Sequence, residues 1–222
     1  MDPLFEDMPE QLFSERLVLR CARADDAPAM NAAVTESLDD LRSTMLWAQV
    51  APTPAQSEAD CRRFHAKFLL REDATMFMFE RRADGSEGAF IGGAGMHRID
   101  WAVRKFEIGY WCRVSQQGRG YVTEAVLALK RHAFERLRAG RVELRMNDDN
   151  VRSRRVAERA GFTLEGVLRH SALNPQGELC DTRVYALTRA GDPGEGSAAG
   201  IGIGSGDARP PDAAATSART GG

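Results

Sequence analysis

The sequence predicts an α/β domain with a mixed, mainly antiparallel sheet flanked by helices. Three strand-like stretches, residues 74–82, 89–99 and 104–113, follow one another with short connections before the chain reaches a glycine-rich loop. Consecutive strands with short connections pair antiparallel, because parallel pairing needs a long crossover. After the loop, helix-like and strand-like stretches alternate, which is typical of an α/β domain. A doubly wound Rossmann fold is excluded, because three strands come in succession ahead of the loop.

Upstream of these strands, local patterns predict one further strand and two helices. Residues 16–20 read RLVLR and alternate polar and apolar side chains, which is typical of a strand with one buried face. A first helix is expected over residues 24–34 and a second over residues 54–71. The second has a clear start: Thr53 is an N-cap, proline follows in the first turn, and Gln56 stands three residues after the cap.

The rest of the domain is expected to contain two more helices and three more strands. The helices end near residue 137 and at residue 160, where Gly161 occupies the position of a helix C-terminal glycine. The strands are residues 141–146, 162–169 and 179–187. Residues 90–95, FIGGAG, lie inside an earlier strand and predict a bulge or a close backbone approach. In total, the sequence predicts a seven-stranded sheet and about four helices.

Composition divides the chain of 222 residues into three parts. Residues 14–189 carry the strand and helix patterns and form one expected domain, which is long enough to bury a sizeable core. Residues 1–13 are expected to be an N-terminal extension. Residues 190–222 contain no aromatic residue and are rich in glycine, alanine, proline and serine, so they bury too little apolar surface to offset their ordering entropy. We therefore expect a disordered tail there.

Charge and cysteine usage exclude several classes of protein. A net charge of −2 argues against a dominant nucleic-acid-binding surface. The four cysteines lie far apart without a C-x-x-C pair, which is typical of a reduced chain without a zinc site, so no metal is expected. The acidic N-terminus lacks the apolar core of a signal peptide, and no apolar run approaches the ~18 residues of a membrane span. We expect a cytoplasmic protein that binds neither membranes nor nucleic acid directly.

The glycine-rich loop indicates an anion site. Residues 116–126 read QQGRGYVTEAV, so Gly118 and Gly120 flank Arg119 immediately before an expected helix. A helix start carries free N–H groups and the positive end of the helix dipole, and glycines let a phosphate approach them. A P-loop is excluded because no Lys-Ser/Thr pair follows, and the spacing does not fit G-x-G-x-x-G. For two glycines alone, a tight turn before a helix is the alternative.

The wider context of the loop resembles the GNAT acetyltransferase superfamily. Its pyrophosphate loop is written Gln/Arg-x-x-Gly-x-Gly/Ala, in which Gln117 fits the first position and Gly120 the glycine, whereas Val122 departs from the small last residue. Two other stretches resemble the RimJ/RimL branch, which acetylates ribosomal-protein N-termini. They are SERLVLR at residues 14–20 and NDDNVRSRRVAERAGFTLEG at residues 147–166. Together the matches span nearly the whole expected domain.

The resemblance implies a GNAT fold with a site for acetyl-CoA. A V-shaped cleft would open between two central strands, one ending at Cys112 and the other beginning near Arg141. The pantetheine arm would pair with the strand backbone at Trp111 and Cys112, as an added strand does. The residues implied at the pyrophosphate are Gln117, Gly118, Arg119, Gly120, Tyr121, Val122 and Thr123.

The next helix completes the implied site. Asn150 would bond the pantetheine chain, and its alternative role is a helix N-cap. Ser153 would give a proton to the departing CoA thiolate, and its alternative is a solvated helix serine. Arg152, Arg154 and Arg155 could reach the 3′-phosphate of CoA, with a solvated basic helix face as the alternative.

Glu107 is the expected general base. The attacking amine must be neutral, and α-amino groups ordinarily have a pKa near ~7.7–8 against ~10.4 for lysine, so an N-terminal acetyltransferase needs only a weak base or a water relay. Glu107 could point into the cleft, and the alternative is a strand glutamate that faces solvent or a structural partner. Tyr110 alternates away from Glu107 and should face the opposite side of the sheet. His97 and His170 are further relay candidates, with ordinary strand or surface histidines as the alternative.

The resemblance implies an acetyl-CoA-dependent N-acetyltransferase whose acceptor is a protein N-terminal α-amine of the ribosomal-protein type. Residues 45–52 and 54–71 lie where this family shapes its acceptor groove. One alternative is the same fold acting on a small amine, such as an antibiotic, a polyamine or an amino acid. Another is a non-catalytic acyl-CoA-binding module, against which Asn150, Ser153 and Glu107 argue together. A larger donor such as succinyl-CoA, and a homodimer, are both left open.

Overall fold

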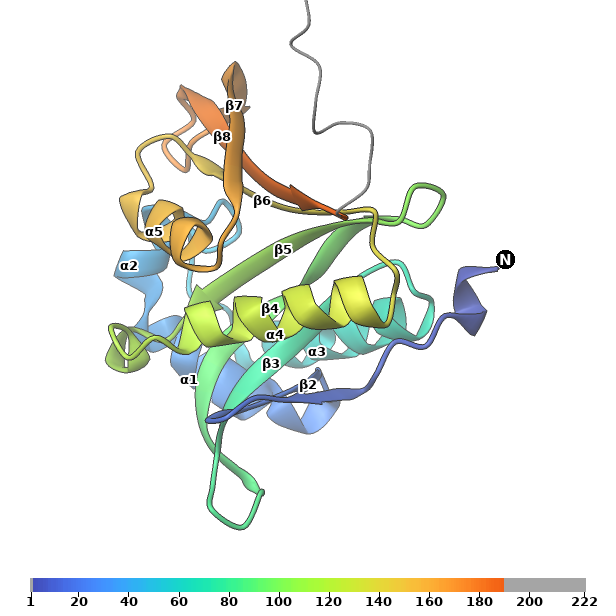
Figure 1. Ribbon diagram of the computed structural model, residues 1–222. Helices are drawn as coiled ribbons and strands as arrows, with labels where there is room; N and C mark the ends of the chain where they lie inside the picture. Colours follow the sequence, from blue (N-terminus) through green and yellow to red (C-terminus); the bar gives the residue numbers. More distant parts are fainter. Residues whose placement is uncertain (1, 190–222) are drawn as a thin grey trace, which may run out of the picture. The chain divides into compact units, whose positions relative to one another are not determined.

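The computed structural model describes residues 2–189, which form one sheet flanked by helices (Figure 1). The eight strands are β1 (Gln11–Phe13), β2 (Leu17–Cys21), β3 (Ala74–Arg81), β4 (Glu87–Asp100), β5 (Lys105–Cys112), β6 (Arg141–Asn147), β7 (Thr163–Leu173) and β8 (Leu179–Thr188). Their order across the sheet is β1-β2-β3-β4-β5-β6-β8-β7. Every neighbouring pair is antiparallel except β5 and β6, so the predicted mixed, mainly antiparallel sheet is confirmed.

Helices cover both faces of the sheet. The α-helices are α1 (Ala27–Glu36), α2 (Leu38–Arg42), α3 (Pro54–Leu69), α4 (Tyr121–Glu135) and α5 (Val151–Arg159). In Figure 1, α4 crosses the front of the central strands while α1 and α3 lie behind them. One buried cluster includes α4 and another includes α1 and α3, each together with the sheet. The fold is therefore built of three layers around the central strands.

The counts differ from the sequence prediction by one strand and one helix, since seven strands and about four helices were expected. The additional strand, β1, lies within residues 1–13, where an extension was expected, and it pairs with β2 from Gln11 to Phe13. β1 was not predicted, because its three residues are too few to show the alternation of polar and apolar side chains that indicates a strand. The additional helix, α2, has five residues and follows α1 after Ser37, so it has no periodic signature either. The predicted tail at residues 190–222 lies outside the described residues.

The start of α3 is built as the sequence predicted. Thr53 Oγ1 accepts a hydrogen bond of 3.2 Å from the Gln56 N–H, and Gln56 Oε1 accepts one of 2.8 Å from the Thr53 N–H. This reciprocal capping box satisfies two donors that would otherwise lack partners at the helix end. It fixes where α3 begins, and α3 forms one wall of the larger cavity described below.

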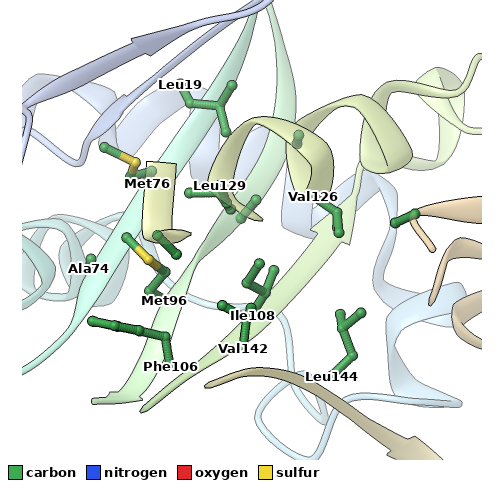
Figure 2. Close-up of a cluster of buried hydrophobic side chains, with 14 of the residues drawn as sticks. Leu19, Ala74, Met76, Met96, Phe106, Ile108, Val126, Leu129, Val142 and Leu144 are labelled. Atoms are coloured by element: carbon green, nitrogen blue, oxygen red, sulfur yellow. The ribbon is translucent and has the colours of Figure 1, made fainter. Parts of the chain in front are cut away.

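The core between α4 and the sheet is apolar and fully enclosed (Figure 2). Val126 and Leu129 of α4 pack with Met76, Met96 and Ile108 from three adjacent strands, and none of the five is more than 2% exposed. Full burial of such a side chain stabilises the fold by about 1.5–3 kcal/mol. This packing holds α4, and with it the loop at its N-terminus, against β5.

The strand β2 differs from the half-buried strand that RLVLR predicted. All five of its residues are buried, including Arg20, which is 4% exposed. The Arg20 guanidinium binds the carboxylates of Asp26 and Glu87, each at 2.6 Å. Burying a charge costs free energy unless it is paired. Arg20, a polar residue of the RLVLR pattern, therefore belongs to an internal ion pair and does not face solvent.

Candidate active site

The two parallel strands at the centre of the sheet separate and leave an opening. Strands β5 and β6 pair at three positions only, which join Lys105, Phe106 and Glu107 to the first three residues of β6. Beyond Glu107, β5 continues to Cys112 without a partner on that side, and β6 continues to Asn147. The separation is visible in Figure 1. This is the predicted V-shaped cleft, and it leaves one edge of β5 able to pair with a bound ligand.

The loop after β5 presents backbone N–H groups at the start of α4. Gly118 and Gly120 have φ angles of 76° and 81°, in the left-handed region that favours glycine. The first helical hydrogen bond runs from the Glu124 N–H to the Gly120 carbonyl, at 3.1 Å. The N–H groups of the three residues before Glu124 therefore point out of the helix end, where they and the helix dipole can bind an anion.

An ion pair from outside the loop fixes its shape. Arg16, just before β2, pairs with Glu124 of α4 at 2.7 Å and donates a hydrogen bond of 3.0 Å to the carbonyl oxygen of Arg119. The Arg16 guanidinium also lies 4.8 Å from the centre of the Tyr121 ring. Ser14 donates a hydrogen bond of 2.7 Å to the same Glu124 carboxylate. The sequence indicated a strand and a family match at SERLVLR, but not this supporting role.

A cavity of about 350 Å³ lies between the loop, β5 and α5. Ten of the twelve predicted site residues line it: Trp111, Cys112, Gln117, Gly118, Gly120, Tyr121, Val122, Thr123, Asn150 and Ser153. Arg119 and Glu107 are not part of the lining. Arg119 contributes its carbonyl to the contact with Arg16, so its structural contact in the loop is made by the backbone. We call this space the donor cavity.

A polar network joins three elements at the rim of the donor cavity. Gln117 donates a hydrogen bond of 2.8 Å to Asp40 of α2. Arg152 of α5 donates to the same carboxylate at 2.8 Å and to the Gln117 side-chain oxygen at 3.1 Å. Asp40 was not predicted, because α2 itself gave no signal. Arg155 also lines the cavity, whereas Arg154 faces Glu158 at 3.8 Å on the helix surface.

The start of α5 brings a hydroxyl and an amide to the donor cavity. Asn150 Oδ1 accepts a hydrogen bond of 3.0 Å from the Ser153 N–H, so Asn150 is the N-cap of α5 and retains its amide NH₂ as a donor. The Tyr110 hydroxyl donates to the Ser153 carbonyl at 3.4 Å. Burial raises the pKa of Tyr110 to about 12 and that of the Cys112 thiol to about 11. Both groups therefore keep their protons near neutral pH.

A second cavity, of about 640 Å³, lies on the α1 and α3 side of the opening. We call it the acceptor cavity, and its walls include the loop that carries Trp47 as well as α3, the regions expected to shape an acceptor groove. Trp47 is 55% exposed, and its ring centre lies 6.1 Å from that of Trp111 in an edge-to-face contact. The two cavities share six lining residues: Thr44, Met45, Tyr110, Trp111, Asn150 and Ser153.

Two glycines in β4 make room for Trp111 beside the acceptor cavity. A Cβ atom on Gly93 would lie 2.6 Å from the Trp111 indole nitrogen, and one on Gly92 would lie 2.3 Å from the Trp111 carbonyl oxygen. Both distances are shorter than real contacts. Bulges also interrupt the pairing of β3 with β4. The close backbone approach predicted for residues 90–95 is therefore observed. It leaves space for the backbone and the indole ring of Trp111 to pack against β4.

Glu107 lies beside the acceptor cavity and is engaged by arginines. Its carboxylate accepts a hydrogen bond of 2.8 Å from Arg98 and lies 4.0 Å from Arg145. It pairs directly with His97 across the β4–β5 ladder, so both side chains project from the same face of the sheet. Arg145 and His97 line the cavity, whereas Glu107 does not. Its role as the base remains a prediction.

Of the two histidines considered, the structure places only His97 in the site. His97 Nδ1 lies 2.8 Å from Asp73 Oδ2, and both residues line the acceptor cavity. His170 lies on β7 with an exposed side chain, and its backbone N–H donates to Asp181. Asp73 was not singled out from the sequence, because an isolated aspartate ahead of a strand carries no signal of such a partner.

Residues 2–189 contain neither a candidate metal site nor a candidate membrane-spanning helix. No group of three or more His, Cys, Asp or Glu side chains in this part of the chain is arranged to hold a metal ion. No helix in the same range is long and apolar enough to cross a membrane.

Comparison with known proteins gives the family to which this fold, with its two adjoining cavities, belongs. The acetyltransferase (GNAT) domain family matches residues 16–163, and the chain belongs to this family. It is accordingly an N-acetyltransferase that uses acetyl-CoA.

Named relatives are similar along most of their length. The ribosomal-protein-serine acetyltransferase of Escherichia coli (strain K12) is 30% identical over 161 residues, which are 71% of this chain and 85% of that protein. The YdaF protein of Bacillus subtilis (strain 168) is 28% identical over 183 residues, which are 79% and 93% of the two chains. The structure of RimL, a ribosomal L7/L12 alpha-N-protein acetyltransferase in complex with coenzyme A, superposes with a TM-score of 0.72. It is 23% identical and covers 81% of this chain and 98% of that one, so it shows the shared fold.

Proposed function

We propose that this protein transfers the acetyl group of acetyl-CoA to the N-terminal α-amine of a protein, a ribosomal protein being the leading acceptor. The observation that carries the proposal is the junction of the donor and acceptor cavities at Tyr110, Trp111, Asn150 and Ser153. A thioester in one cavity and an amine in the other would meet there. Direct transfer needs this proximity, which alone can supply a large share of the rate enhancement.

The donor cavity suits the parts of acetyl-CoA in order. The free N–H groups at the start of α4 would receive the pyrophosphate. The unpaired edge of β5 at Trp111 and Cys112 would receive the pantetheine arm as an added strand. The amide NH₂ of Asn150, which lines the donor cavity, would bond the same arm. Arg152 and Arg155 of α5 add positive charge near the phosphates.

The reaction follows from this placement. The amine nitrogen attacks the thioester carbonyl carbon, negative charge develops on the oxygen, and the carbon–sulfur bond breaks to release CoA thiolate. Ser153 is the proposed donor of a proton to that thiolate. Glu107, at the edge of the acceptor cavity, is the base that the sequence predicts. An α-amine suits a site with weak bases, because its pKa near ~8 leaves a useful neutral fraction at neutral pH.

The relatives support a protein acceptor. The Escherichia coli relative is named for acetylating a ribosomal-protein serine, and the similarity covers 85% of its length. A ribosomal-protein acceptor would place the reaction in the cytoplasm. A homodimer stays a prediction of the sequence.

A small amine is the second candidate acceptor. The acceptor cavity, at about 640 Å³, falls within the ~300–1,000 Å³ range typical of small-molecule sites. Its aromatic walls at Trp47, Phe64 and Phe77 would suit an apolar body with one amine.

The test is an assay of thiol release with acetyl-CoA over a panel of acceptors. The panel comprises lysine-free peptides with free N-termini, the same peptides with blocked N-termini, polyamines, amino acids and amine antibiotics. Release with free but not blocked peptides supports the proposal. Release with only the small amines would replace it by the second candidate. Succinyl-CoA in parallel reactions tests whether the acyl pocket takes a larger donor.

A further inference from the structure

We propose that His97, held by Asp73, accepts the proton that the amine loses during acetyl transfer. This inference rests on the proposed function and names a group in the same site. The two side chains line the acceptor cavity: His97 belongs to β4, and Asp73 directly precedes β3.

Hydrogen bonds fix the orientation of the imidazole. His97 Nδ1 lies 2.8 Å from one oxygen of Asp73, and Thr75 donates a hydrogen bond of 2.7 Å to the other oxygen. An ionised carboxylate only accepts, so Nδ1 carries the proton of a neutral imidazole and Nε2 presents a lone pair. Burial raises the pKa of Asp73, but the hydrogen bonds from His97 and Thr75 outweigh it, and the pKa is lowered. The partner of His97 is therefore an anion at working pH.

A glycine in β5 lets the imidazole extend over the strand. A Cβ atom at Gly109 would lie 2.8 Å from Cδ2 of His97 and 3.2 Å from Nε2. The first distance is too short for a real contact, so any larger residue would displace the ring. The glycine of FEIGYW, which sequence reasoning left unexplained, thus gives Nε2 its position next to β5.

That position is where the thioester would lie. A pantetheine arm paired with β5 at Trp111 and Cys112 would run from the loop back along the strand. Its acyl end would then reach the level of Tyr110 and Gly109, which line the acceptor cavity together with His97. His97 lines the acceptor cavity at that level, whereas the carboxylate of Glu107 is bound by Arg98 and is not part of the lining.

Other charged groups line the same cavity or face His97 from the sheet. Lys67 and Asp60 of α3 line the same cavity, as does Arg145 of β6. From its own sheet, His97 faces Glu107 across the ladder, and the adjacent Arg98 neutralises part of that charge. The immediate partner is still the Asp73 anion, which would stabilise an imidazolium formed during the reaction.

The proton balance is simple. As the nitrogen–carbon bond forms, the nitrogen becomes positive and passes one proton to Nε2 of His97. The carbon–sulfur bond then breaks, and the thiolate takes a proton either from solvent or from Ser153, which then regains one from solvent. His97 returns its proton to solvent before the next turnover. Asp73 acts through His97 and is a positioning residue.

The main experiment compares His97→Asn with His170→Asn. The second variant is a matched control, because His170 is exposed and its φ of 45° suits asparagine. With the acceptor identified by the panel, we expect His97→Asn to lower kcat by about 10²-fold, the low end of general base catalysis. The control should match the native protein, and CoA affinity measured by calorimetry should stay unchanged in both.

Two further variants retain His97 and test whether the orientation of its ring matters. Gly109→Ala retains His97 but displaces its ring, so kcat should fall while CoA still binds. Asp73→Asn should give a smaller loss of kcat and alter the pH profile, because the partner of the imidazole is no longer charged.

Chemical rescue decides between catalysis and structure. In His97→Ala, added imidazole should restore part of kcat by occupying the vacated space. Native kcat in His97→Asn at every pH would overturn the proposal. A fall in kcat that accompanies lost CoA binding, without rescue by imidazole, would also overturn it and give His97 a structural role. Inactivity of the native protein with every acceptor would instead overturn the proposed function, and this proposal with it.

Discussion

Arg16 and Glu124 form an ion pair of 2.7 Å that joins the residue before β2 to the first turn of α4. They are 108 residues apart in sequence. Through this pair, Arg16 is held where it can donate a hydrogen bond to the Arg119 carbonyl within the anion-binding loop. The shape of the donor site thus depends on a contact outside the loop itself.

Removing the arginine should weaken cofactor binding without unfolding the protein. In Arg16→Ala, the loop loses its hydrogen bond at Arg119. A typical hydrogen bond contributes ~0.5–1.5 kcal/mol, so we expect the Kd for CoA to rise by about 2–10-fold. Calorimetry would measure this, with Arg62→Ala as a control, because the Arg62–Glu58 pair lies on the exposed surface of α3. An unchanged Kd in Arg16→Ala would show that the loop keeps its shape alone.

The partner carboxylate should make stability depend on pH in the acidic range. Burial raises the pKa of Glu124, but hydrogen bonds from Ser14 and Arg16 outweigh it and lower the pKa below the ordinary value of 4.5. The native state therefore binds this proton less readily than the unfolded state. The resulting stabilisation is fully present above about pH 4.5 and is lost as the pH falls through the lowered pKa.

Glu124→Gln should remove that contribution. In urea denaturation, the variant should be less stable than the native protein at neutral pH, and the difference should shrink as the pH is lowered below 4.5. A difference that is constant over the whole range would mean that the charge of Glu124 does not contribute.

A side chain at Gly120 should weaken both the stability of the protein and the binding of CoA. Gly120→Val places a β-branched residue at φ 81°, which costs about 1–3 kcal/mol and blocks the approach of a pyrophosphate. Gly85→Val is the matched control, since Gly85 has φ 82° in the β3–β4 hairpin with open space around it. Both variants should lose similar stability, but only Gly120→Val should lose CoA binding by calorimetry. Undiminished binding in Gly120→Val would disprove the donor site.

The sequence predicted those parts of the molecule that local rules specify. The Thr53 capping box and the left-handed conformation at Gly161 were observed as expected. The tertiary contacts were not predictable: Arg16 reaches Glu124, 108 residues away, only when α4 packs on the sheet, and His97 meets Asp73 only when β3 and β4 pair. The same limit applies to Glu107, whose strand was predicted but whose partner Arg98 depends on the irregular end of β4.

The hydroxyl of Ser153 should act late in the reaction. If it protonates the departing thiolate, Ser153→Ala should lower kcat more than it weakens CoA binding. General acid catalysis is worth ~10²–10⁴-fold, and a thiolate is already a tolerable leaving group, so we expect the low end. The N-cap survives this change, because Asn150 accepts from the Ser153 backbone rather than from its side chain. Native kcat in the variant would restrict Ser153 to lining the cavity.

The charge of Glu107 should matter most when the acceptor amine is protonated. An α-amine with a pKa near ~8 is half neutral at that pH but mostly charged at pH 6.5, where it must lose a proton to react. Glu107 lies opposite His97 and adds negative charge at that side of the acceptor cavity. We therefore expect Glu107→Gln to slow the reaction modestly at pH 8 and more severely at pH 6.5.

A pH–rate profile of kcat/KM with a lysine-free peptide measures this effect for native protein, Glu107→Gln and the exposed control Glu178→Gln. For an α-amine acceptor, the native profile should rise with pH and level off near pH ~8, whereas a lysine side chain would still be gaining rate at pH ~9. If Glu107→Gln matches native protein at every pH, its carboxylate serves only to bind Arg98. If the peptide is inert while a polyamine turns over rapidly, the N-terminal acceptor is wrong and the small-amine function takes its place. The two outcomes are independent, because the first compares variants on one acceptor and the second compares acceptors on the native protein.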